Sequence, residues 1–269
     1  LVNAAEKVEA GYAAIIGTPV PAVIGTDYQA LKRMCEKRTE LPVLTVDTDG
    51  MELYDVGERK AYVELFKAFA REKLPAETGK IGILGMTPQD VSDPGAADKI
   101  REKFRVQGLK AVCYGMGDGL DEIKKASSAE RNIVVSPAAL ECAKYLEKSF
   151  GTPYEVGYPL VDELMRELDH VGKKVLVVHQ QVIANSIRDV VREHDEDAEV
   201  TVASWVSMEK DLLEEGDVSL RDEDDYIELV ENGSFDVIFA DPCMGRMIPG
   251  FEGTFIPLTH FAVSGKLNV

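Results

Sequence analysis

The sequence predicts an α/β protein built from Rossmann-like units in tandem, each with a doubly wound parallel sheet. Three observations support this fold class: short uninterrupted apolar runs, amphipathic stretches between them, and one order of elements that occurs twice. Apolar runs bounded by turn residues are typical of strands that are covered on both faces. Strands that alternate with helices at this spacing pair in parallel through right-handed crossovers.

The first part of the chain holds the least complete unit. We expect a strand at 13–17, a turn and helix through 25–37, a strand at 42–46 and a long helix at 58–73. A sheet of two strands is too small to be stable alone, so it must pack on the other units or on sequence outside this chain. Residues 1–78 are therefore expected to form the C-terminal part of a first Rossmann-like unit.

Two further units have the order β-α-β-α-β, and we place them at residues 79–171 and 172–269. Each begins with an apolar run and continues with charged amphipathic helices. Each also adds a fourth strand near its end. In the second unit the expected strands are 81–85, 109–114, 132–135 and one after 151–153, and the helices are 96–107, 120–129 and 138–150. In the third unit the expected strands are 175–178, 199–204, 236–240 and 254–257, and the helices are 183–194 and 222–231.

The composition excludes several classes of partner. The chain has 30 basic and 48 acidic residues, a net charge of −18, so its surface would repel nucleic acid and anionic membranes. No apolar run approaches the roughly 20 residues of a membrane span, and no signal-peptide pattern is present. Four widely spaced cysteines without a C-x-x-C pair argue against a disulfide framework. We expect a cytoplasmic protein, and read a chain that starts at Leu1 as a piece of something longer.

Several reactive side chains follow predicted strands. Open parallel sheets bind ligands at the carboxyl ends of their strands, beside the switch in strand order. His179 follows one strand, Asp241 and Cys243 follow another, and His260 comes three residues after a fourth. A thiolate and an imidazole suit iron, which makes Cys243 and His260 the candidate metal ligands. The alternative for each is a structural role, as a buried turn residue or a packed histidine.

The glycine-rich turn at 115–119 does not match the dinucleotide-binding motif. Its spacing departs from G-x-G-x-x-G, and it follows the second strand of its unit rather than the first. Backbone N–H groups there could still hold an anion. No Walker sequence, G-x-S-x-G elbow or H-E-x-x-H motif occurs. NAD binding is therefore not the expected function.

Six short segments together resemble the nitrogenase component 1-type oxidoreductase family. That family includes the molybdenum–iron protein subunits, their cofactor-assembly scaffold relatives and the dark-operative protochlorophyllide reductase subunits. The segments occur in the family's order over nearly the whole chain. They are residues 15–27, 42–50 with Tyr54 and Gly57, 83–86, 132–135, 150–153 and 257–265.

The resemblance implies three Rossmann-like domains around a central site, of which this chain corresponds to the end of the first and all of the other two. The family's cluster-ligating cysteine falls at Pro19, which has no donor atom, and its other cysteines would lie before Leu1. The cofactor-binding cysteine falls near Ser136, and the ligand histidine matches His260. A thiolate-ligated cluster needs about four cysteines at one point. An iron–sulfur cluster or metallocluster is thus expected only in the complete assembly, not on this chain alone.

Two functions remain open on the sequence. The first is a subunit, or part of one, of a component 1-like oxidoreductase that receives electrons from an ATP-dependent iron protein and pairs with a homologous subunit. The second is a non-catalytic scaffold that holds a metallocluster or tetrapyrrole between domains. The candidate cofactor-binding residues are Ser136, His179, Cys243 and His260.

Overall fold

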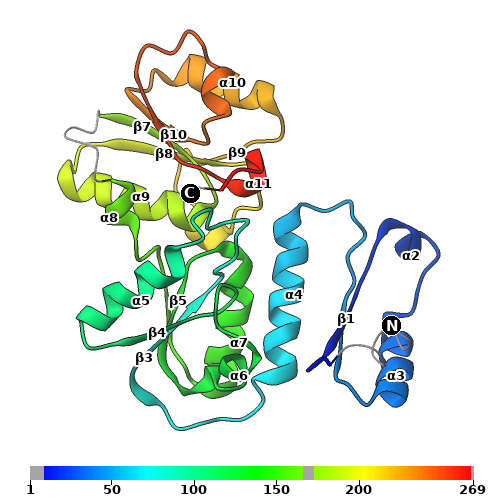
Figure 1. Ribbon diagram of the computed structural model, residues 1–269. Helices are drawn as coiled ribbons and strands as arrows, with labels where there is room; N and C mark the ends of the chain where they lie inside the picture. Colours follow the sequence, from blue (N-terminus) through cyan, green and yellow to red (C-terminus); the bar gives the residue numbers. More distant parts are fainter. Residues whose placement is uncertain (1–8, 166–172, 268–269) are drawn as a thin grey trace.

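The computed structural model describes residues 9–165 and 173–267, and it contains three parallel sheets (Figure 1). One has two strands, β1 (Ala13–Ile16) and β2 (Val43–Val46). A four-stranded sheet has the order β4-β3-β5-β6, and a five-stranded sheet has the order β11-β10-β7-β8-β9. The strand pairs within all three sheets are parallel. The predicted fold class is confirmed.

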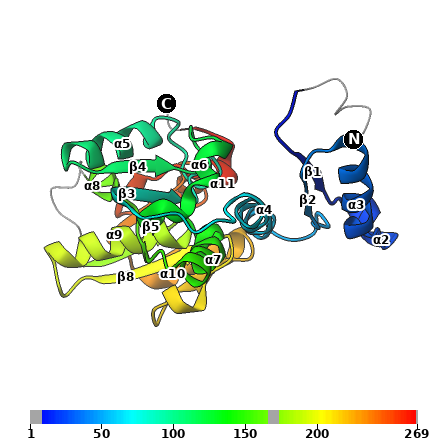
Figure 2. The ribbon, with the colours of Figure 1, turned by 90° about the horizontal axis from the view of Figure 1, so that it is seen from below.

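Helix α4 (Tyr54–Phe69) joins the two-stranded sheet to the rest of the molecule. Between β1 and β2 the chain forms α2 (Pro19–Val23) and α3 (Tyr28–Thr39). One side of α4 contacts β2, and another buries Tyr62 and Phe66 in the apolar cluster on the four-stranded sheet. Figure 1 and Figure 2 both show α4 between the two parts. In the part of the chain that the structure describes, α4 thus links the small sheet to the four-stranded sheet.

The position of α4 corrects the predicted helix at 58–73. The helix begins four residues earlier, at Tyr54, with Asp55 in its first turn, where a carboxylate is favourable. It ends at Phe69, with Ala70 as its C-cap, and the Ala70 backbone N–H donates to the Phe66 carbonyl oxygen. The earlier start places Tyr54 and Asp55 on a rigid element.

In the four-stranded sheet, the switch in strand order lies between β3 and β5. The predicted helix 120–129 is too long: it ends at Lys124, and a 3₁₀ turn, Ala126–Ser128, leads into β5. The buried Ser128 hydroxyl in that turn donates to Glu77 and accepts from Lys80. The strands are β3 (Glu77–Leu84), β4 (Lys110–Cys113), β5 (Ala129–Val134) and β6 (Tyr154–Val156), and the helices are α5 (Ala96–Val106), α6 (Leu120–Lys124) and α7 (Leu140–Phe150).

In the five-stranded sheet, the switch lies between β7 and β10. The sequence did not predict β9, because a strand of two residues carries no periodicity. The short helix α8 (Val161–Leu164) precedes this sheet. The strands are β7 (Lys174–Val178), β8 (Glu199–Ser204), β9 (Val218–Ser219), β10 (Val237–Ala240) and β11 (Thr254–Pro257), and the helices are α9 (Gln181–His194), α10 (Glu223–Gly233) and α11 (Phe261–Ser264).

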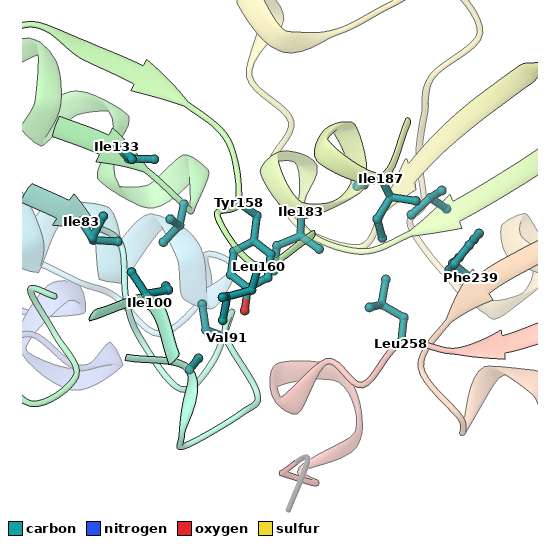
Figure 3. Close-up of a cluster of buried hydrophobic side chains, with 14 of the residues drawn as sticks. Ile83, Val91, Ile100, Ile133, Tyr158, Leu160, Ile183, Ile187, Phe239 and Leu258 are labelled. Atoms are coloured by element: carbon teal, nitrogen blue, oxygen red, sulfur yellow. The ribbon is translucent and has the colours of Figure 1, made fainter. Parts of the chain in front are cut away.

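The two larger sheets share one hydrophobic core. Ile83 and Ile133 contribute from the four-stranded sheet and Phe239 from the five-stranded one, with Tyr158 and Leu160 between them (Figure 3). Burial of this shared face holds the two sheets together. The domain boundary at 78–79 remains a prediction, since β3 begins at Glu77, and the boundary at 171–172 lies outside the described residues. In residues 9–165 and 173–267, no helix is long and apolar enough to cross a membrane.

Gly82 in β3 allows the side chains of Asn132 and Tyr114 to lie close to the backbone at the centre of the four-stranded sheet. A Cβ atom there would lie 2.2 Å from Asn132 Oδ1 and 3.1 Å from the Tyr114 ring. We therefore expect Gly82→Ala to lower the free energy of unfolding by roughly 1–3 kcal/mol, because the overpacked core must shift. Gly250→Ala is the matched control, since no atom lies within 4 Å of its added Cβ. Equal stability of the two variants in urea denaturation would contradict this account.

Candidate functional site

The carboxyl edges of the two larger sheets meet, and polar side chains gather there. Ser136 follows β5, His179 follows β7, Asp241 follows β10, and Asp90 lies in the loop between β3 and α5. His260 precedes α11. Each of these five side chains is 2% exposed or less. Together with Tyr54 of α4 they are called the junction cluster below.

Asp90 is the acceptor at the centre of the junction cluster. Its Oδ1 accepts the Tyr54 hydroxyl at 2.5 Å, and its Oδ2 accepts the Ser136 hydroxyl. His260 Nε2 lies 3.2 Å from the Tyr54 oxygen and 3.7 Å from Asp90 Oδ1. Because the single Tyr54 hydroxyl proton points to Asp90, His260 Nε2 has to be the donor to the Tyr54 oxygen. We thus assign the proton on His260 to Nε2.

His179 stacks on His260. The ring centroids are 4.2 Å apart, with 20° between the ring planes. Burial, and secondarily the nearby His260, lowers the pKa of His179 well below its usual range. His179 is therefore neutral at physiological pH, and its Nε2 lies 3.3 Å from the Thr259 carbonyl oxygen. Its Nδ1 is buried and has no hydrogen-bond partner among the described residues.

Asp241 holds the loop that carries His260. Its Oδ2 accepts the His260 backbone N–H at 2.9 Å and the Ser264 hydroxyl at 2.7 Å, and its Oδ1 accepts the Cys243 backbone N–H at 2.9 Å. Burial alone would raise the pKa of Asp241, but these hydrogen bonds outweigh it and leave the pKa below its usual value. Asp241 therefore stays ionised and fixes the backbone at Cys243 and at His260.

Cys243 and His260 share Asp241 through their backbones, but their side chains contact different groups. Cys243 is half-buried against the apolar cluster that includes Trp205, on the side of the five-stranded sheet covered by α10. Burial, and next the Asp241 carboxylate, raises the pKa of the Cys243 thiol to about 11, so it is protonated at neutral pH. The metal-binding role of Cys243 and His260 remains a prediction.

The donors in the junction cluster do not fit a thiolate-bound iron–sulfur cluster. Around His260 they are hydroxyl, carboxylate and imidazole groups. Among the described residues, no three or more His, Cys, Asp or Glu side chains are grouped so that they could hold a metal ion. Cys113 is buried near the Ala97 carbonyl oxygen, and burial raises its thiol pKa to about 12. We therefore assign no chemical step of this chain to such a cluster.

A small cavity adjoins the junction cluster. Its volume is about 60 Å³, and Asp90, Ser92, His179 and Thr259 are among the residues that line it. That volume holds a few water-sized molecules. A metallocluster or a tetrapyrrole does not fit there without movement of the surrounding chain.

Sequence reasoning missed three acidic or phenolic residues at this site: Tyr54, Glu58 and Asp90. Both carboxyl oxygens of Glu58 are buried. Burial, then the negative charge of Asp90, raises the pKa of Glu58 to about 8. A signal for Asp90 was available, because it lies in the loop after the first strand of its unit, where ligand-binding residues are expected. Tyr54 was noticed only as part of a family segment.

The fold and site define a class: an α/β protein of tandem parallel sheets whose polar site lies at their joined carboxyl edges. The chain belongs to the family described as nitrogenase component 1 type oxidoreductase, whose sequence model matches residues 1–189. It is 27% identical over 155 residues to the nitrogenase iron-molybdenum cofactor biosynthesis protein NifE of Klebsiella pneumoniae. That alignment covers 53% of this chain and 34% of the NifE protein, about a third of its length.

Two solved structures show the same fold. The chain is similar to nitrogenase Cp1 at pH 5, with a TM-score of 0.71, 13% identity, and coverage of 99% of this chain and 68% of the other. It is also similar to nitrogenase Cp1 at pH 6.5, with a TM-score of 0.66, 12% identity, and coverage of 99% and 70%. At this identity the similarity extends to the fold alone.

The raised pKa of Glu58 predicts a pH-dependent stability. In the unfolded chain Glu58 ionises near pH 4.5, whereas in the folded protein it does so near pH 8. The folded state therefore binds more protons between these values, and stability falls as the pH rises through this window. Glu58→Gln removes the cost of ionising this buried acid. We therefore expect the change in unfolding free energy caused by Glu58→Gln to be more favourable at pH 8.5 than at pH 4, by up to about 4 kcal/mol.

Urea denaturation of wild type and variant at the two pH values measures this effect. Glu64→Gln is the matched control, because Glu64 lies on the same helix and is about 40% exposed beside Lys67. A pH-independent effect of Glu58→Gln, or the same effect in Glu64→Gln, would refute the assignment.

Proposed function

We propose that this chain is part of a component 1-type oxidoreductase subunit that reduces a ligand held at the junction of the two larger sheets. In the complete assembly, electrons would come from an ATP-dependent iron protein. One observation carries the proposal: hydrogen-bonded acid, hydroxyl and imidazole groups lie at the joined carboxyl edges, where open parallel sheets bind ligands. Reduction that adds hydrogen to a ligand requires protons, and these groups hold protons.

Within this proposal, three of the four candidate binding residues act together. Ser136 and His260 both lie within reach of Asp90, and His179 stacks on His260. Their hydroxyl and imidazole groups would contact the ligand and orient it. Cys243 lies on the far side of Asp241 and would contribute only by holding that carboxylate in place. Any iron–sulfur cluster would be held by ligands from other parts of the assembly.

The second candidate is a non-catalytic scaffold for a metallocluster or tetrapyrrole. It is favoured by the absence of a thiolate from the junction cluster. The similarity to NifE also favours it, because that protein is named for iron-molybdenum cofactor biosynthesis. A scaffold of this kind would have to open the junction, since the cavity there is only about 60 Å³.

Iron analysis and electron paramagnetic resonance separate the two candidates. The full-length gene product is purified without oxygen and mixed with an iron protein, ATP and a reductant. The oxidoreductase proposal predicts bound iron and a signal that changes on reduction in an ATP-dependent manner. Iron or a tetrapyrrole that binds but is never reduced would support the scaffold, and the absence of both iron and reduction would refute the oxidoreductase.

Substitutions in the same protein locate the ligand. We expect His260→Ala to reduce bound ligand at least tenfold, because it removes a junction imidazole, and Cys243→Ser to have little effect. His194→Ala on the exposed end of α9 is the control. Loss of ligand in Cys243→Ser with retention in His260→Ala would reverse the assignment of roles.

We also propose that the protein is cytoplasmic and that a homologous subunit covers its first unit. Large apolar side chains are exposed together around α2 and the loop before α4. They are Ile16, Val20, Val23, Ile24, Met51 and Leu53, exposed by 52–86%. Contiguous apolar surface of this kind is typical of protein–protein interfaces.

Sedimentation of the full-length protein tests this interface. We expect an oligomer at micromolar concentration, and we expect Val23→Asp to weaken its association at least tenfold by placing a charge in the apolar surface. Val106→Asp is the matched control, because Val106 is 71% exposed on α5, away from α2. A compact monomer, or equal effects of the two variants, would contradict the proposal.

A further inference from the structure

His179 has a ring nitrogen that no described residue satisfies. The side chain is 2% exposed, and its Nε2 lies 3.3 Å from the Thr259 carbonyl oxygen. A carbonyl oxygen can only accept a hydrogen bond, so the ring proton is on Nε2 and Nδ1 carries a lone pair. Nδ1 is buried and has no hydrogen-bond partner among the described residues. Buried polar atoms in proteins are nearly always hydrogen-bonded, so Nδ1 requires a donor that these residues do not supply.

The small cavity that His179 lines has room for such a donor. Its volume is about 60 Å³. A water molecule takes up about 30 Å³ in the liquid, so the cavity holds two waters or one molecule of about three non-hydrogen atoms. The other polar residues of the lining are Asp90, Ser92, Asp93 and Thr259, and the apolar ones include Val91, Ile183 and Leu258.

The chemistry of the lining selects the kind of molecule. Both Asp90 oxygens act as acceptors, and the carboxylate of Asp93 is paired with Lys99. The Ser92 hydroxyl oxygen accepts the Phe261 backbone N–H, which leaves the hydroxyl proton able to donate. An anion would face acceptor groups, and a cation would lose its hydration against apolar side chains. A neutral molecule with an N–H or O–H group avoids both costs.

We propose that this cavity is a binding site for one small neutral molecule whose N–H or O–H group donates to His179 Nδ1. The inference rests on the proposed reductase function for its purpose, and it names the chemical class of the ligand. A molecule that has an N–H next to a carbonyl also has an acceptor for the Ser92 hydroxyl. His179 is then the residue that selects a donor over an anion of the same size.

Formamide is the probe, because it has three non-hydrogen atoms, an N–H group and no charge. Formate has the same size and shape but is an anion without an N–H, and ammonium has N–H groups with a positive charge. The chain has only four histidines, so their ring ¹⁵N signals can be resolved, and those of His179 are assigned by their loss in His179→Phe. We expect formamide to shift the Nδ1 signal saturably in the full-length protein, with a dissociation constant of about 1 mM at best for so small a ligand. Formate and ammonium should bind at least roughly tenfold more weakly.

Two variants of the lining test the same site. His179→Phe keeps a flat ring but has no Nδ1, so formamide affinity, followed at the Ser92 backbone amide signal, should fall roughly tenfold. Val91→Ile adds a methyl group to the lining and should also weaken binding, and it gives the answer if His179→Phe fails to fold. His194→Phe at the exposed end of α9 is the matched control and should bind formamide as the wild type does.

Three results would overturn the proposal. They are the lack of a saturable shift at His179, binding of formate or ammonium as tight as that of formamide, and an unchanged formamide affinity in both lining variants. The test needs neither iron protein nor substrate, so it is separate from the test of the reductase. Formamide binding in a protein that accepts no electrons would keep the site and refute the reductase. Reduction by an iron protein without formamide binding would keep the reductase and refute the site.

Discussion

The shared apolar core between the two larger sheets is the constraint on which the rest of the structure depends. Ile83 and Ile133 on one side and Phe239 on the other are removed from water only if the sheets pack together. At roughly 25 cal/mol per Å² of buried apolar surface, that burial is the main force between the sheets. It also fixes their relative orientation, which brings two carboxyl edges and their switch points to one place.

Polar groups at that place are buried as a consequence, and each must be satisfied. A buried carboxylate without partners is strongly unfavourable, so Asp90 accepts two hydroxyls and Asp241 accepts two backbone N–H groups and one hydroxyl. At Glu58, burial and the neighbouring negative charge of Asp90 raise the pKa, so this acid keeps its proton instead.

Helix α4 connects this chemistry to the first unit. Its middle covers the four-stranded sheet with Tyr62 and Phe66, while its first two turns supply Tyr54, Asp55 and Glu58 to the junction. Asp55 reaches the Ser207 backbone N–H of the third unit. Helix α4 therefore contacts both the second and the third unit, and its N-terminal end lies at the junction cluster.

The sequence by itself determined the order and type of most elements and the neighbourhood of the site. Uninterrupted apolar runs mark parallel strands, and residues just past them must lie at the carboxyl edge, which is why His179 and His260 could be expected there. Ser136 was named only from the family resemblance. The sequence alone could not predict contacts between distant residues. Tyr54 and His260 are 206 positions apart, and no sequence pattern indicates that they are in contact. Tertiary structure also packed Cys243 against the apolar cluster that α10 covers. Hydrogen-bond partners and burial depend on how sheets pack across the shared core, and that packing is a property of the whole chain.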